Sequence, residues 1–127
     1  MNPMSASPRK AVVETYLEGF RRGDHATILD CLTDDVEWEM PGYFSHRGKD
    51  AFDKEIENEA FVGHPVITAD RLVEEGDTVV AIGAVQGRFR TGEPLEAVFA
   101  DVFTFRGDKI SRLETYQVTL SPPPAAA

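Results

Sequence analysis

The chain lacks most features of exported, metal-binding or nucleic-acid-binding proteins. Its single cysteine, Cys31, can form neither an intramolecular disulfide nor a cysteine-based zinc cluster. Its three histidines, His25, His46 and His64, stand at separations that match no metal motif, so we expect no metal. Basic residues are also scarce: 13 lysines and arginines face 22 aspartates and glutamates, a net charge of −9. A scattered basic minority argues against nucleic-acid binding.

Long apolar runs are missing as well. None approaches the roughly 20 residues that cross a bilayer, and the N-terminus has no apolar core of a signal peptide. No glycine-rich loop for nucleotide phosphates is present. We therefore expect a cytoplasmic protein with no membrane partner and no cofactor.

The remaining composition fits one small globular domain. The hydrophobic share of 42% and the charged share of 28% are ordinary for such a domain. A chain of 127 residues is long enough to bury a core. We expect a single domain over residues 7–120, with flexible termini at 1–6 and at 121–127, where prolines and alanines end the sequence.

Helix signals are confined to the first half. Ser7 can cap a helix that has Pro8 at its first position, and Gly23 can end it in a left-handed turn. Asp24 can then cap a short second helix. A strand from Val36 to Met40 follows, and we expect a third helix from about Lys49 to Ala60.

Strand signals fill the second half. Four runs of strand-forming residues, at about 66–74, 78–90, 95–105 and 109–120, are separated by short glycine-containing turns. Short turns join antiparallel neighbours, so the sequence predicts an α+β fold of three helices followed by a meander. Gly83 and Gly87 lie inside one strand, where they favour a bend or a bulge.

The strand around Asp101 holds the most informative residue. Phe99, Asp101 and Phe103 share one face by the strand period of two, and Ala100 and Val102 share the other. Because both faces are apolar, we expect a central strand covered on both sides. A carboxyl group there needs a partner or a raised pKa, and a raised pKa suits acid–base chemistry near neutral pH. The alternative is a structural aspartate paired with an arginine or a backbone donor.

Other side chains are candidates for the same pocket. Tyr16 lies in the apolar stripe of the first helix and either donates a hydrogen bond into the pocket or packs in the core. His46 follows an aromatic loop and is a candidate proton carrier. We expect the pocket walls, or else plain core packing, from Trp38, Met40, Phe44, Phe61, Phe99, Phe103, Leu113 and Gln117.

Several motifs along the chain resemble one known superfamily. Tyr16-Leu17-Glu18-Gly19-Phe20, Arg47-Gly48-Lys49-Asp50-Ala51-Phe52 and Ala100-Asp101-Val102-Phe103 are similar to segments of nuclear-transport-factor-2-like domains. The resemblance spans about residues 9–119 and is greatest for the polyketide-cyclase-like (SnoaL-like) branch, which is similar to ketosteroid isomerase. It implies a cone of curved sheet and three helices, usually dimeric, around an apolar pocket.

The resemblance also implies roles for single residues. Tyr16 and Asp101 match the two groups with which ketosteroid isomerases bind an enolate oxygen, a system in which a neutral carboxylic acid donates a hydrogen bond. The proton-shuttling aspartate of those isomerases is replaced here by Met40, before Pro41, so Glu39, His46 or Asp101 would have to serve as the base. In polyketide cyclases the late-strand aspartate is the acid–base group, and Asp101 matches it. The Asp-Arg-Asp set of related epoxide hydrolases has no convincing counterpart.

Two hypotheses about function follow. The first is a cofactor-independent isomerase or cyclase that moves protons on a small hydrophobic carbonyl compound such as a polyketide, steroid or terpene. The second is a non-catalytic ligand-binding or accessory domain, which the missing base favours. A homodimer through the outer face of the sheet is expected in either case, because the strand containing Val80, Ile82 and Ala84 is apolar on both faces.

Overall fold

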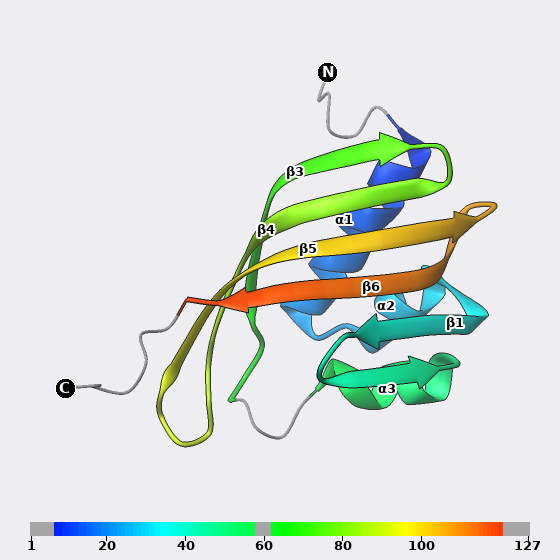
Figure 1. Ribbon diagram of the computed structural model, residues 1–127. Helices are drawn as coiled ribbons and strands as arrows, with labels where there is room; N and C mark the ends of the chain where they lie inside the picture. The colour runs from blue at the N-terminus through cyan, green and yellow to red at the C-terminus, as the bar shows by residue number, and fades with distance from the viewer. Residues whose placement is uncertain (1–6, 58–61, 121–127) are drawn as a thin grey trace.

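The computed structural model describes residues 7–57 and 62–120 and has an α+β architecture, as the sequence predicts (Figure 1). Three helices lie against one face of a six-stranded sheet. Among the described residues, no helix combines the length and apolar character needed to cross a membrane. In chain order the elements are α1 (Pro8–Arg22), α2 (His25–Asp30), β1 (Leu32–Met40), β2 (Phe44–Arg47), α3 (Lys49–Ile56), β3 (Val66–Glu75), β4 (Thr78–Arg88), β5 (Pro94–Arg106) and β6 (Lys109–Thr119).

The first two helices begin and end as their sequences predict. The Ser7 hydroxyl accepts a hydrogen bond from the Lys10 amide, which satisfies one of the free donors at the start of α1. Gly23 ends α1 with φ of 65°, a conformation that favours glycine. Asp24 then caps α2 by accepting from the Thr27 amide at 3.1 Å. These caps fix where α1 ends and where α2 begins.

The sheet has the strand order β2-β1-β6-β5-β4-β3. The four strands from β3 to β6 form the predicted antiparallel meander, and β5 lies between β4 and β6. β1 pairs with β6 in parallel, so the N-terminal strand extends the sheet beyond the last strand of the chain. This pairing brings the Trp38 region of β1 beside Leu113 of β6.

Three boundaries differ from the sequence prediction. β1 begins at Leu32 rather than Val36, with an irregular register against β6 between Leu32 and Glu37. The segment expected to be a loop contains β2, a four-residue edge strand that pairs only with β1. α3 ends at Ile56 because Glu57 is extended, with φ of −114° and ψ of 109°; the predicted helix end near Ala60 lies outside the described residues.

An aromatic cluster joins the helices to the sheet. Phe52 of α3 stacks on Trp38 of β1 with ring centroids 4.4 Å apart, and it meets Tyr16 of α1 edge-on at 6.2 Å. Tyr16 in turn packs edge-on against Phe103 of β5 at 5.3 Å. Contacts of this geometry favour a fixed arrangement beyond the burial of apolar area.

Two histidines connect α3 to the neighbouring elements β2 and α2. His46 of β2 makes a 2.9 Å contact from Nε2 to Glu55, and His25 of α2 contacts both Asp53 and Glu57 through its two ring nitrogens. These pairs hold α3 to β2 and α2, and thereby keep Phe52 against Trp38.

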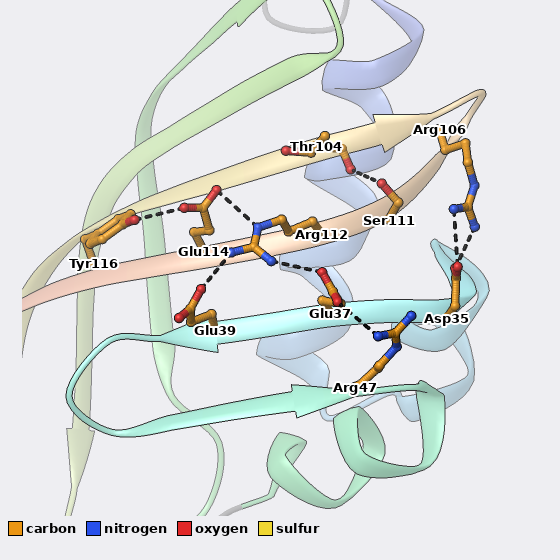
Figure 2. A network of polar contacts seen from close by, with 10 residues as sticks. All are labelled: Asp35, Glu37, Glu39, Arg47, Thr104, Arg106, Ser111, Arg112, Glu114 and Tyr116. Atoms are coloured by element: carbon orange, nitrogen blue, oxygen red, sulfur yellow. Dashed lines mark hydrogen bonds and ion pairs between the residues drawn. The ribbon is translucent and has the colours of Figure 1, made fainter.

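The outer face of the sheet is open in the single chain, which corrects one expectation. Residues of β5 that point toward the helices are buried, but on the opposite face Val98 is 39% exposed. The strand is therefore central, as predicted, but covered on one side only. Figure 2 shows the polar part of the outer face, where Arg112 contacts Glu37 at 2.9 Å, Glu39 at 2.6 Å and Glu114 at 3.5 Å.

Gly83 in β4 allows β3 to approach closely at an irregular point of the sheet. The register between β3 and β4 shifts between Ala69 and Arg71, directly beside the Ala69–Gly83 pair. A Cβ atom at position 83 would overlap the Thr68 carbonyl oxygen and would lie 2.9 Å from the Ala69 Cα. The bulge expected from this glycine is confirmed, and a side chain there would force the two strands apart.

We expect Gly83→Ala to destabilise the protein by roughly 1–3 kcal/mol, because the added methyl group meets backbone atoms that cannot rotate away. Gly87→Ala is the matched control: it lies in the same strand, its added methyl group would meet nothing within 4 Å, and it should be neutral or stabilising. Urea unfolding of both variants measures the difference. Equal free energies of unfolding would contradict the close-approach argument.

Candidate functional site

A cleft of about 150 Å³ lies between α1 and the inner face of the sheet. Every strand except β2 contributes to it, and most of its lining is aromatic or aliphatic. The lining residues are Tyr16, Leu17, Phe20, Trp38, Pro65, Ile67, Val85, Phe99, Asp101, Thr115 and Gln117. A larger, shallow hollow on the outer side of α1 has charged side chains such as Glu18 and Arg22 that are exposed to solvent, so it offers no desolvated polar group.

Asp101 is the one acidic residue in the lining of this cleft. It is 9% exposed, and its Oδ1 atom is fully buried with no hydrogen-bond partner among the described residues. Loss of hydration penalises the charged form, so burial raises the pKa of Asp101 to about 7 against an ordinary value of 3.8. A carboxyl group with this pKa exists in both protonation states near neutral pH.

Thr115 lies directly across from Asp101 on β6 and is the polar neighbour of its carboxyl group. A hydrogen bond from the Thr115 side chain favours the charged carboxylate and lowers the pKa of Asp101, against the larger effect of burial. The Thr115 Oγ1 atom accepts a buried hydrogen bond of 3.0 Å from the Trp38 indole N–H. Trp38 of β1 is thus bonded to Thr115 of β6, the residue that pairs with Asp101 of β5.

Tyr16 approaches the same cleft from α1. Burial, and secondly the negative charge of Asp101, raise the pKa of the Tyr16 phenol well above its ordinary value. The phenol therefore stays protonated and remains a hydrogen-bond donor over the physiological pH range. The effect of the Asp101 charge on this pKa also shows that the two side chains are electrostatic neighbours.

The structure brings together five of the side chains singled out in the sequence. Besides Tyr16 and Asp101, the lining of the cleft includes Trp38, Phe99 and Gln117. The other predicted wall residues that the structure describes, Met40, Phe44, Phe103 and Leu113, do not line it, and Phe61 lies outside the described residues. Phe103 and Leu113 are instead fully buried core residues beneath the cleft.

Two of the three groups considered as replacements for the missing base lie outside the cleft. His46 is on edge strand β2, where it stacks on Phe44 at 4.6 Å and contacts Glu55. Glu39 points to the outer face and pairs with Arg112, as the alternation along β1 predicts (Figure 2). Of the three alternatives, Asp101 is the one in the cleft.

Sequence reasoning missed the other six residues of the described lining: Leu17, Phe20, Pro65, Ile67, Val85 and Thr115. Thr115 could have been found from the meander register, because it falls on the same inward face of β6 as Leu113 and Gln117. Phe20 belongs to the apolar stripe of α1, and helical periodicity does not distinguish a residue that lines a cleft from one packed in the core. Ile67 and Val85 depend on the β3–β4 register, which the bulge shifts.

The arrangement is suited to proton transfer in an apolar setting. A carboxyl group whose pKa is about 7 and a phenol donor line the same cleft, and most of the other lining residues are apolar. No cluster of three or more potential metal-binding side chains occurs among the described residues. The cleft also lacks a second carboxylate or an arginine, so its described lining does not form the Asp-Arg-Asp set of the epoxide hydrolases.

Comparison with protein families relates this geometry to known proteins. A family model described as a SnoaL-like domain matches residues 13–113. Comparison with curated proteins finds no match to this chain.

Three solved structures with the same fold each share about a quarter of their residues with this chain. A nuclear-transport-factor-2-like (NTF2-like) protein from Anabaena variabilis is 27% identical, with a TM-score of 0.78 over 93% of this chain and 95% of that one. TerC, crystallised with polyporic acid, is 24% identical, with a TM-score of 0.78 over 86% and 90% of the two chains. A candidate polyketide cyclase from Xanthomonas campestris is 23% identical, with a TM-score of 0.75 over 86% and 89%. The fold expected from the sequence resemblance is confirmed.

The raised pKa of Asp101 predicts a specific dependence of stability on pH. Between pH 4 and pH 7 the folded protein keeps a proton on Asp101 that the unfolded chain has lost, because the two pKa values are about 7 and 3.8. The stability contribution is complete below pH 4 and is lost as pH rises through 7, a change on the order of 4 kcal/mol.

Asp101→Asn, which stays neutral at every pH, should lack this change. Urea unfolding of both proteins from pH 4 to pH 8 isolates it as the difference between two curves, which removes the contributions of all other titrating groups. Parallel curves would show that Asp101 has an ordinary pKa.

Proposed function

The chain belongs to the SnoaL-like domain family, and from this membership we propose that it is a cofactor-independent enzyme that transfers protons on a small hydrophobic carbonyl compound. The observation that carries the proposal is Asp101, a buried cleft carboxyl group whose pKa is raised to about 7. The alternative open from sequence, a structural aspartate paired with an arginine or a backbone donor, is not supported by these contacts: its polar neighbour is the Thr115 side chain, and Oδ1 has no partner among the described residues.

The chemistry requires two groups. The Asp101 carboxylate removes a proton from the carbon beside the substrate carbonyl, and the electron pair of that C–H bond moves to the carbonyl oxygen, forming an enolate. Tyr16 donates a hydrogen bond to the developing oxyanion, whose stabilisation is strongest in a site without water. The neutral Asp101 then returns the proton to another carbon, which gives an isomer. In a ring closure, the enolate carbon instead attacks a second carbonyl, and the proton goes to the new alkoxide.

The cleft restricts the class of substrate. Its volume of about 150 Å³ is below the usual range for drug-sized ligands of roughly 300–1,000 Å³, so it suits a small ring or one end of a larger molecule. Phe20, Trp38 and Phe99 provide flat apolar walls, which favour an aromatic or unsaturated ring. The relatives crystallised with polyporic acid or described as a candidate polyketide cyclase support a polyketide-like compound.

A second candidate is a non-catalytic domain that binds the same class of compound. The observation in its favour is that the first strand offers no base: Met40 is a thioether outside the cleft, and Glu39 faces the other side of the sheet. In that case Asp101 and Tyr16 would hold a carbonyl oxygen without removing a proton.

We also propose that two copies of the chain pair through the outer face of the sheet. Val98 and Val118 pair across β5 and β6 and are both exposed, and Tyr116 is exposed beside them. Apolar side chains gathered on one open face favour a protein partner.

Hydrogen–deuterium exchange of a simple ketone tests the enzymatic function without knowledge of the natural substrate. With 1-indanone in D₂O, we expect the wild-type protein to accelerate loss of the C2 proton signal in NMR, with a rate that rises with pH around a midpoint near 7 as the Asp101 carboxylate forms. Asp101→Asn should lower the protein-dependent rate by about a hundredfold or more. Tyr16→Phe should lower it through loss of the oxyanion donor.

Asp108→Asn is the matched control, because it removes an exposed carboxylate in the β5–β6 turn. It should leave the exchange rate unchanged. Thermal stabilisation by 1-indanone without exchange would favour the non-catalytic candidate. If neither 1-indanone nor related ketones and quinones exchange or stabilise the protein, the small-molecule function fails.

Light scattering tests the dimer. We expect a particle of twice the 14.0 kDa chain mass, and Val98→Asp, which introduces a charge in the apolar face, should return it to one chain. Tyr43→Asp changes an exposed aromatic in the β1–β2 turn and should leave the mass unaltered. A wild-type particle with the mass of one chain would exclude this dimer.

A further inference from the structure

The two oxygens of Asp101 have different surroundings. Oδ1 is buried without a hydrogen-bond partner among the described residues, whereas the carboxyl group as a whole receives a hydrogen bond from Thr115. Thr115 lies directly opposite on β6, which leaves Oδ2 as the oxygen available to its hydroxyl. A buried polar atom without a partner is costly, which suggests that Oδ1 is kept free for something the protein binds.

Trp38 sets the direction of the Thr115 hydroxyl. The indole N–H can only donate, so in the 3.0 Å bond to Thr115 the hydroxyl oxygen is the acceptor. The hydroxyl proton of Thr115 then points to another acceptor, and Asp101 lies directly opposite on the neighbouring strand. The polar chain therefore has one direction, from Trp38 through Thr115 to Asp101.

The indole itself cannot turn away. Trp38 is buried and touches aromatic rings on three sides: it stacks on Phe52 at 4.4 Å and meets Phe44 and Phe20 edge-on at 5.0 and 6.1 Å. These rings come from α3, β2 and α1, so the orientation of the N–H is set by the packing of three elements. Rigid support of this kind is what a precisely oriented functional group requires.

We propose that Trp38 and Thr115 are positioning residues that bind Oδ2 of Asp101 and thereby reserve Oδ1 as the atom that gives and takes the proton in the cleft. In the neutral acid Oδ2 is the carbonyl oxygen that accepts from Thr115, and the proton lies on Oδ1. In the carboxylate the Thr115 bond remains on Oδ2, and Oδ1 is the basic atom. The roles of both residues rest on the proposed proton transfer by Asp101.

The surroundings of Asp101 make the effect measurable. From α1 the facing titratable group is Tyr16, which burial keeps as a neutral phenol. On β4, Ala81 pairs with Asp101 and carries no polar group, and on β6 the facing side chain is Thr115. No charged residue other than Asp101 belongs to the described lining of the cleft, so loss of the Thr115 bond is not masked by a neighbouring charge.

The test is the pKa of Asp101 in the ligand-free protein, measured by carboxyl ¹³C NMR. Thr115→Val should raise it by about one unit, a tenfold change in the dissociation constant, because the charged form loses its donor. Thr115→Ser keeps the hydroxyl and should retain the wild-type pKa. Trp38→Phe should cause a smaller rise, since the Thr115 hydroxyl is then free to turn.

A double variant separates the proposed relay from ordinary packing. If Trp38 acts on Asp101 through Thr115, adding Trp38→Phe to Thr115→Val should produce no further change in the pKa. Tyr116→Phe, which alters an exposed side chain of β6 on the outer face of the sheet, should leave the pKa unchanged. Additive shifts in the double variant, or an unchanged pKa in Thr115→Val, would overturn the proposal.

Infrared spectroscopy locates the proton on the neutral acid. The carbonyl stretch of Asp101, isolated as the difference between wild type and Asp101→Asn at pH 5, should move to higher frequency in Thr115→Val, because the carbonyl oxygen loses a donor. A constant frequency would place the carbonyl on Oδ1 and contradict the assignment. Thr115→Ala replaces Thr115→Val in both measurements if the valine variant does not fold.

These outcomes are independent of the ketone assay. The pKa and infrared measurements need no ligand, so the relay can fail while 1-indanone exchange is observed. In the converse case the pKa and infrared measurements agree with the roles of Trp38 and Thr115, no ketone exchange is observed, and only the proposal of a catalytic function fails.

Discussion

Loss of water from one carboxyl group is the constraint on which the arrangement of this molecule depends. Asp101 lies on the inward face of the meander, and its hydration is replaced by one hydrogen bond and by aromatic surfaces. Burial raises the pKa of Asp101 and the Thr115 hydroxyl partly lowers it, so that both protonation states are populated near neutral pH. Additional hydrogen-bond donors would lower the pKa of Asp101 and favour the carboxylate, whereas loss of the Thr115 hydroxyl would raise the pKa and favour the neutral acid. The rest of the fold maintains this intermediate condition.

The helices and the sheet contribute differently to that condition. The strands set spacing, because the register places Asp101, Thr115 and Gln117 on one inward face. The helices contribute apolar side chains: Tyr16 and Phe20 of α1 line the cleft, and Phe52 of α3 stacks on Trp38. The outer face of the sheet shows the opposite chemistry, with Arg112 surrounded by glutamates on three sides (Figure 2). Charge is thus separated from the cleft by the thickness of one sheet.

Much of this could be predicted from sequence because the relevant signals are local. Helix caps, strand alternation and short turns are encoded within a few residues, and they correctly gave α1, α2 and the meander. Period-two alternation also placed Asp101 inside and Glu39 outside. The errors have separate causes: β2 is too short for its periodicity to be read, and apolar residues on both faces of β5 do not by themselves show that both faces are covered. The wall residues were misjudged because periodicity gives the face of a strand but not what covers it. Phe99 and Phe103 share a face, but Phe99 lines the cleft, whereas Phe103 packs against Tyr16 of α1.

The irregular pairing at Gly83 has a consequence for the adaptability of the cleft. Ile67 and Val85, which face each other across β3 and β4, line the cleft two residues from that glycine. The acid–base and hydrogen-bonding groups are carried by other elements: Asp101 and Thr115 by the β5–β6 hairpin, Tyr16 by α1. The β3–β4 wall of the cleft and its polar groups are therefore supplied by different side chains, although β4 and β5 are paired neighbours in the sheet. Substitutions at Ile67 or Val85 would therefore change the width of the cleft without replacing any of its polar groups.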